Sequence, residues 1–210
     1  MRSLTSTHQG RIIISGTGRA GTTFLVQLLT KLGFGTGFSP SEVLTGVDGI
    51  SRAGLERALV DDSNPYVIKS PWFSDHLAEA LQDRKIDIYA ALIPIRGLFE
   101  AAESRRRVYQ EVGNQGLDPL AHPGSLWRTK DPSKQEEILA GQFYATIFPL
   151  VKHDVPIYLM EFPRLVTDAD YLFKVLKALL SDHGVSRLQF LDAHKAIARP
   201  ALVHQFAKSA

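Results

Sequence analysis

The 210-residue sequence contains no cysteine. That absence excludes disulfides, thiolate zinc sites and thiol catalysis, and it is typical of proteins from reducing compartments. No apolar run approaches the roughly 18 residues of a membrane span, and the polar residues 1–10 lack the apolar core of a secretory signal. We therefore expect a cytoplasmic protein without a transmembrane segment.

Excess charge is also scarce. Lysine and arginine number 24 against 22 aspartates and glutamates, which gives a formal net charge of +2. This balance is far from the basicity of a nucleic-acid binder, and the basic residues do not alternate with aromatic ones. We expect no nucleic-acid partner, so any anion site has to come from a local cluster of charge.

Short apolar runs alternate with amphipathic stretches along the chain. The apolar runs predict strands at 12–14, 66–68, 86–93 and 157–160, with Pro94 ending the third. The amphipathic stretches predict helices at 21–33, 74–81, 97–112, 133–151 and 168–180, with Ser74 as the N-cap of the second. This alternation indicates an α/β fold with a mainly parallel sheet, and the length favours a single domain over residues 1–210. Residues 113–132, rich in proline and glycine, form either a functional lid or an ordinary surface loop.

A glycine-rich turn separates the first predicted strand from the first predicted helix. Residues 16–23, Gly-Thr-Gly-Arg-Ala-Gly-Thr-Thr, fit the frame G-x-x-x-x-G-x-[ST]. Glycines let the backbone curl so that successive N–H groups converge, and a helix N-terminus adds unpaired donors and the positive end of a dipole. The turn therefore predicts a phosphate site. Thr22 stands where nucleotide kinases carry the lysine that reaches the β- and γ-phosphates, which argues against an ATPase.

The run from Arg19 to Phe24, Arg-Ala-Gly-Thr-Thr-Phe, resembles the R-S-G-T-T-x motif of the P-loop sulfotransferases, which use 3′-phosphoadenosine-5′-phosphosulfate (PAPS). The resemblance covers residues 11–182 and implies a P-loop-containing three-layer α/β/α fold of the compact bacterial type. It implies that the cofactor is bound by Gly18, Arg19, Ala20, Gly21, Thr22, Thr23 and Phe24. Phe24 stands where the family often has an aromatic against the adenine, and it equally suits the core of the first helix.

The same family holds the 3′-phosphate of PAPS with an arginine at the end of a central strand and a serine eight residues later. Arg96 and Ser104 have this spacing, and Arg96 is expected at the carboxyl edge of the sheet, where α/β proteins bind ligands. The family's R-x-P is replaced here by Pro-Ile-Arg-Gly at 94–97. Three successive arginines follow at 105–107. Because they point in three directions around a helix, at most two of them face the site.

Lys69, in Val-Ile-Lys-Ser-Pro at 67–71, is similar to the family's strand-end K-x-P segment. The similarity implies a catalytic lysine that meets the negative charge building on the departing phosphate, although a strand-end lysine alone is often a surface cation. One branch of the family has a histidine two residues later, where this chain has Pro71. Another branch uses a glutamate after the first helix, which makes Glu42 the candidate general base and His76 the second choice. Both also suit helix positions without a catalytic role.

Three functions remain open at this point. The resemblance favours a PAPS-dependent sulfotransferase that needs no metal and sulfates a hydroxyl or amine of a small molecule, lipid or glycan. A P-loop small-molecule kinase would instead use ATP with Mg²⁺, with Glu161 as the metal partner and Arg96 on a phosphate. The third function is a non-catalytic nucleotide-binding module. Neither the acceptor nor the oligomeric state has a sequence motif of its own.

Overall fold

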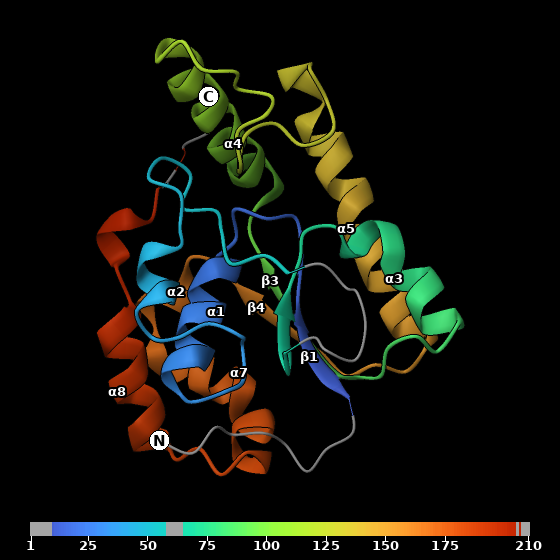
Figure 1. The fold of residues 1–210 in the computed structure, drawn as a ribbon, viewed down its shortest axis with the longest axis vertical. Coiled ribbons are helices and arrows are strands. Elements are labelled where there is room, and N and C mark those ends of the chain that lie inside the picture. Colours follow the sequence, from blue (N-terminus) through green and yellow to red (C-terminus); the bar gives the residue numbers. More distant parts are fainter. Residues whose placement is uncertain (1–9, 58–64, 205, 207–210) are drawn as a thin grey trace.

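The described residues form a sheet of four parallel strands. The computed structural model describes residues 10–57, 65–204 and 206, so most of the polar N-terminal segment considered above lies outside the described part. The strands are β1 (Arg11–Ile14), β2 (Val67–Lys69), β3 (Ile88–Ile95) and β4 (Ile157–Glu161). Their order is β2-β1-β3-β4, and every neighbouring pair is parallel (Figure 1). The predicted parallel sheet is confirmed, and the carboxyl ends of all four strands meet at one edge.

Helices connect the successive strands, as parallel pairing requires. After β1 come α1 (Thr22–Lys31) and α2 (Glu42–Thr45), and after β2 comes α3 (Phe73–Gln82). After β3 come α4 (Leu98–Asn114), the short 3-10 helix η1 (Pro132–Lys134) and α5 (Gln135–Lys152). After β4 come α6 (Arg164–Thr167), α7 (Ala169–Asp182), α8 (Arg187–Ile197) and the 3-10 helix η2 (Pro200–Leu202). Within the described ranges, no helix is long and apolar enough to cross a membrane.

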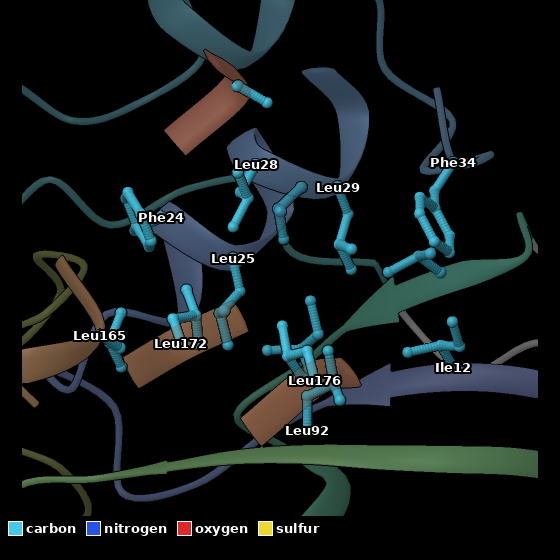
Figure 2. Packing of buried hydrophobic residues seen from close by; sticks show 14 of the residues in the cluster. Ile12, Phe24, Leu25, Leu28, Leu29, Phe34, Leu92, Leu165, Leu172 and Leu176 are labelled. Carbon is cyan, nitrogen blue, oxygen red and sulfur yellow. The ribbon is translucent and has the colours of Figure 1, made fainter. Parts of the chain in front are cut away.

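Two apolar clusters, one on each face of the sheet, make the three layers. Ile12 and Ile14 of β1 point into the first cluster and Ile13 into the second, as the pleat of a strand requires. The first cluster includes Leu25, Leu28 and Leu29 of α1 and Leu172 and Leu176 of α7 (Figure 2). The second cluster includes Phe73, Leu77 and Leu81 of α3 and Leu150 of α5. The predicted three-layer α/β/α architecture is therefore confirmed.

β3 runs through Pro94 to Ile95, so the prediction that Pro94 ends this strand is wrong. β3 pairs with β1 only as far as Leu92, opposite Ile14, because the chain then leaves β1 for the glycine-rich loop. On its other side β3 pairs with β4 up to Ile95, whose carbonyl accepts from Phe162 N at 2.7 Å. Alternate residues of a strand bond to opposite neighbours. The missing N–H of Pro94 therefore faces the side on which β1 has already ended, and no ladder bond is lost.

Two helices differ from the expectations, α3 in the residue that caps it and α8 in being present at all. α3 begins at Phe73 with Trp72 in the N-cap position and no side-chain cap, so the predicted cap by Ser74 is wrong. α8 has no counterpart among the predicted helices. It begins with a capping box, in which Ser186 Oγ accepts from Gln189 N and the Gln189 side chain accepts from Ser186 N.

Leu176→Ala is expected to lower the free energy of unfolding by about 2–5 kcal/mol, because Leu176 is fully buried and its removal leaves a cavity. The same substitution at Leu188, which is 71% exposed on α8, is expected to change it by no more than about 0.5 kcal/mol. Urea denaturation followed by circular dichroism measures both values. Equal losses in the two variants would contradict the assignment of the core.

Candidate functional site

The loop of residues 15–21 leaves β1 at the carboxyl edge of the sheet and leads into α1. Its backbone is left-handed at Gly16, Gly18, Arg19 and Gly21, where φ is 136°, 68°, 56° and 89°. Glycine adopts such values readily, whereas the left-handed conformation costs about 1–2 kcal/mol at Arg19. Gly18 is also required sterically, because a Cβ there would lie 2.6 Å from Arg105 Nη2. Conformation and close packing together fix the shape of the loop.

The amide N–H groups of this loop point to no acceptor in the described part of the protein. From Gly16 to Phe24 they donate to no backbone or side-chain oxygen there, whereas Ser15 N bonds to Leu92 O at 3.3 Å and Leu25 N bonds to Gly21 O at 3.2 Å. Buried backbone donors in native proteins are nearly always paired. A run of unpaired donors that ends at a helix N-terminus is suited to an anion.

Two arginines at this loop have only neutral oxygens as hydrogen-bond acceptors among the described residues. Arg19 Nε donates to Ser104 Oγ at 3.0 Å, and Arg19 Nη1 donates to the carbonyl of Ser51. Arg96 follows β3 directly. Its Nη1 donates to the carbonyl of Arg19 at 3.0 Å, and its Nη2 donates to the carbonyl of His204. Arg19 therefore connects the two predicted holders of the 3′-phosphate, Arg96 and Ser104.

Arg105, on α4, is a third arginine at the loop and is almost fully buried, with 3% of its surface exposed. Its Nη2 donates to the carbonyl of Thr17 and its Nη1 to the carbonyl of Ser125, both at 2.8 Å. Its Nε is buried and has no hydrogen-bond partner among the described residues. The guanidinium also lies 5.5 Å from the ring centroid of Trp127. Arg105 thus joins the loop to the segment that contains Ser125 and Trp127.

The guanidiniums of Arg19, Arg96 and Arg105 form a cluster of positive charge, and no described carboxylate forms an ion pair with any of them. Burial, followed by the charges of Arg96 and Arg107, lowers the pKa of Arg19 to about 10. Burial, followed by the charge of Arg19, lowers the pKa of Arg105 to about 9. Burial also lowers the pKa of Arg96. All three stay protonated at neutral pH, and each pays a desolvation cost that a bound anion would offset.

Lys69 lies at the end of β2, and only 5% of its side chain is exposed. Its Nζ donates to Thr23 Oγ1 at 2.9 Å, to Glu56 Oε1 at 2.8 Å and to the carbonyl of Gly54. Burial lowers the pKa of Lys69, and the nearby negative charge of Glu56 opposes that effect. The structure therefore places a buried ion pair beside the first turn of α1.

The predicted cofactor residues and Lys69 share one pocket of about 730 Å³. Those that line it are Gly18, Arg19, Gly21, Thr22, Thr23, Phe24, Lys69, Arg96 and Ser104. Ala20, also in the loop, is fully buried and does not line the pocket. Phe24 belongs to the first apolar cluster, where its ring meets His194 edge-on at 5.4 Å, so its expected place in the core is confirmed. It also lines the pocket, and its contact with an adenine stays a prediction.

The successive arginines of α4 diverge as predicted. Arg105 and Arg107 line the pocket. Arg106 turns toward α5, where it forms ion pairs with Glu103 and Glu136. The expectation that at most two of the three face the site is confirmed.

Glu42, the predicted general base, lies outside the pocket, so the geometry does not support this role. It is the first residue of α2, and its carboxylate accepts from Ser39 N at 2.6 Å, a contact that lowers the pKa of this exposed side chain. His76 is exposed on α3 and does not line the pocket. Glu161 accepts from Arg164 N at 3.2 Å and also lies outside it. The carboxylate beside Lys69 is Glu56.

Sequence reasoning missed Glu56 and the role of Arg105. Glu56 follows an irregular segment whose only described pairing is an isolated bridge between Val47 and Gly54, so no periodicity marks it. Arg105 was visible as one of three adjacent arginines, but the pattern does not say which of them is buried.

Residues 115–131 connect α4 to η1 and reach the pocket. Trp127 and Gly124 line it, and a Cβ on Gly124 would lie 2.7 Å from Ser51 Cβ. His122 Nε2 lies 3.1 Å from Asp48 Oδ1. The segment therefore packs against the loop of residues 46–54 beside the site, and it stays a candidate lid.

No known protein family matches the sequence, and no curated protein is similar to it. Among solved structures, the chain is similar to the sulfotransferase domain of the olefin synthase from Synechococcus PCC 7002, with a TM-score of 0.45 and 13% sequence identity. The similarity covers 95% of this chain and 85% of that chain.

Glu56→Gln is expected to lower the pKa of Lys69 further, because the substitution removes the negative charge that opposes the effect of burial. In the folded variant Lys69 would then lose its proton at a lower pH than in the parent protein. NMR titration of isotopically labelled lysine measures this, and Glu42→Gln is the matched control, expected to leave the pKa of Lys69 unchanged. An unchanged or raised pKa in Glu56→Gln would contradict the ion pair.

Proposed function

We propose that this protein is a sulfotransferase that takes a sulfuryl group from PAPS and transfers it to a hydroxyl or an amine. The observation that carries the proposal is the run of backbone N–H groups from Gly16 to Phe24, in the loop and the first turn of α1, that have no acceptor among the described residues. This run lies beside three arginines whose described partners are neutral oxygens. Such a concentration of donors and positive charge favours a ligand with several negative charges. PAPS has two anionic groups, a phosphosulfate at the 5′ position and a phosphate at the 3′ position.

Each anionic group has a matching set of residues along the pocket. The 5′-phosphosulfate suits the loop N–H groups with the hydroxyls of Thr22 and Thr23. The 3′-phosphate suits the guanidinium of Arg96 and the hydroxyl of Ser104, because an arginine fork and a hydroxyl can share phosphate oxygens. Phe24 offers its ring to the adenine. The arginines and the loop supply the countercharge, so the proposal requires no metal.

The proposed catalytic group is Lys69. When bound, PAPS supplies an SO₃ group whose bond to the 5′-phosphate oxygen breaks as the acceptor oxygen or nitrogen bonds to sulfur. The ammonium of Lys69 is held beside the first turn of α1 by Thr23 and Glu56. From that place it can stabilise the negative charge that develops on the departing phosphate oxygen. Burial strengthens this effect, because the local dielectric constant is low.

Glu56 is the proposed acceptor of the proton that the nucleophile loses. It is the carboxylate of the pocket that contacts Lys69, and a quarter of its side chain is exposed. A base has to lie within hydrogen-bond reach of the reacting group, and Glu42 is held elsewhere by Ser39. Glu56 and Lys69 would thus act on opposite ends of the same transfer, one on the acceptor and one on the leaving group.

The acceptor is proposed to be a small molecule, a lipid or a glycan. Apolar side chains from two segments, Val47, Ile50 and Trp127, line the same pocket as Lys69 and Glu56. Such a wall is typical of small-molecule sites, in which a few polar groups orient a ligand that is held mainly by apolar contact.

Calorimetric titration with adenosine 3′,5′-bisphosphate, AMP and ATP, each with and without Mg²⁺, tests the donor class. We expect metal-independent binding that favours the bisphosphate. Arg96→Ala is expected to weaken the binding of the bisphosphate by about 10- to 100-fold. This is the change in affinity that corresponds to losing hydrogen bonds to a charged group. Arg106→Ala is the matched control, because Arg106 pairs with Glu103 and Glu136 away from the pocket, and we expect it to bind like the parent protein.

Two results of this titration would overturn the proposal. Preference for ATP with Mg²⁺ would indicate the kinase, and failure of all three nucleotides to bind would remove the donor. Tight binding of the bisphosphate without transfer from PAPS to any member of a broad acceptor panel would indicate a non-catalytic binding module.

Lys69→Met is expected to lower the rate of transfer from radiolabelled PAPS by about 10²- to 10³-fold, because it removes one electrostatic group from the transition state. The affinity for the bisphosphate should fall much less. Lys85→Met serves as the control, since Lys85 is exposed and pairs with Glu79 and Asp83. A Lys69→Met protein with the parental rate would exclude Lys69 as the catalytic group.

A further inference from the structure

We propose that Arg105 is a positioning residue that couples the glycine-rich loop of residues 15–21 to the candidate lid, residues 115–131. This inference rests on the proposed function, since the ligand it concerns is the nucleotide. Arg105 donates to the carbonyl of Thr17 in the loop and to the carbonyl of Ser125 in the lid, both at 2.8 Å. One buried side chain therefore contacts both segments, so a displacement of one segment changes the hydrogen bonding of the other.

On the loop side, Arg105 fixes the direction of a peptide group. In a trans peptide the C=O and the N–H point in opposite directions. Because Arg105 holds the carbonyl of Thr17, the N–H of Gly18 points away from α4. Arg96 holds the carbonyl of Arg19 in the same way and so orients the N–H of Ala20. The directions of these loop N–H groups thus depend on guanidiniums outside the loop. Arg105 orients the N–H of Gly18, and Arg96 orients the N–H of Ala20.

On the lid side, Arg105 holds the point at which residues 115–131 reach the pocket. Ser125 is 1% exposed, and the neighbouring Gly124 packs against Ser51 and Arg19. The ring of Trp127, which lines the pocket, lies over the Arg105 guanidinium. Movement of the lid would displace a carbonyl that Arg105 requires, because no carboxylate among the described residues forms an ion pair with its guanidinium.

An arginine is required for this arrangement. Its planar fork presents donors in fixed, divergent directions, whereas a lysine is a point charge on a flexible stem. The Arg105 guanidinium also fits directly against Gly18, where even a Cβ would approach to 2.6 Å. A residue that supplied charge alone would leave the loop and the lid unconnected.

The experiment uses Trp127 as a reporter. The protein contains two tryptophans, and Trp72→Phe leaves Trp127 as the sole one. In this background Arg105→Met removes the charge and keeps the stem, Arg105→Lys keeps the charge and removes the fork, and Arg106→Met is the matched control. Each variant is titrated with adenosine 3′,5′-bisphosphate while Trp127 fluorescence is recorded. Hydrogen exchange without ligand is measured on two peptides. One covers 13–27 and includes the hydrogen-bonded amides of Ser15 and Leu25 that flank the loop, and the other covers 122–128.

We expect Arg105→Met to weaken bisphosphate binding by about 10- to 100-fold and to abolish the fluorescence response of Trp127. Exchange should increase in both peptides together. Arg105→Lys should show the same joint increase and an intermediate affinity, and Arg106→Met should match the parent in every measurement.

Three results would overturn the inference. The first is parental affinity, fluorescence and exchange in Arg105→Lys, which would show that charge alone matters. The second is an increase of exchange in only one of the two peptides. The third is parental behaviour of Arg105→Met in every measurement. If Arg105→Met does not fold, Arg105→Lys carries the test, because the coupling requires it to loosen both peptides. If the parent protein binds no bisphosphate, the proposed function fails, and the exchange data still decide whether Arg105 couples the two segments.

Discussion

The site depends on a group of positive charges that form no ion pair with any carboxylate in the described part of the chain. Arg19, Arg96 and Arg105 are wholly or partly buried, and their described hydrogen bonds go to carbonyls and one hydroxyl. Removing charges from water is costly unless they are paired. Carbonyl dipoles offset part of this cost, and they come from segments far apart in sequence, such as those of Ser51 and Ser125. The contacts that satisfy the charges therefore also hold the walls of the pocket together.

The parallel sheet explains why these groups meet. In a β2-β1-β3-β4 sheet the carboxyl ends of the three neighbouring strands β2, β1 and β3 lie side by side. Lys69 ends β2, the glycine-rich loop follows β1, and Arg96 follows β3. The extension of β3 through Pro94 brings Arg96 within hydrogen-bond distance of the Arg19 carbonyl. The architecture thus delivers an anion loop, an ammonium and a guanidinium to one edge without long-range adjustment of the backbone.

Local pattern predicted where the strands and the glycine-rich loop lie, except that β3 continues past Pro94 to Ile95. The pairing of Arg96 with Ser104 came from the family resemblance, and its role in binding stays a prediction. Glu42 was chosen by its place after the first helix, but a contact with Ser39 holds it at the start of α2. Glu56 reaches Lys69 because the neighbouring Arg57 N bonds to the carbonyl of Lys69 at 2.9 Å, which holds this irregular segment beside the end of β2. Contacts between loops leave no periodic trace in a sequence, so this half of the site could not be predicted.

We propose that the loop and its arginines form a site for a multiply charged anion. Thermal unfolding with adenosine 3′,5′-bisphosphate, compared with adenosine at the same ionic strength, tests it most directly. A ligand that binds only the folded state at 100 times its dissociation constant stabilises the protein by about 2.7 kcal/mol. We predict that the bisphosphate raises the melting temperature in a concentration-dependent way and that adenosine does not. Identical melting curves with the two compounds would contradict the account.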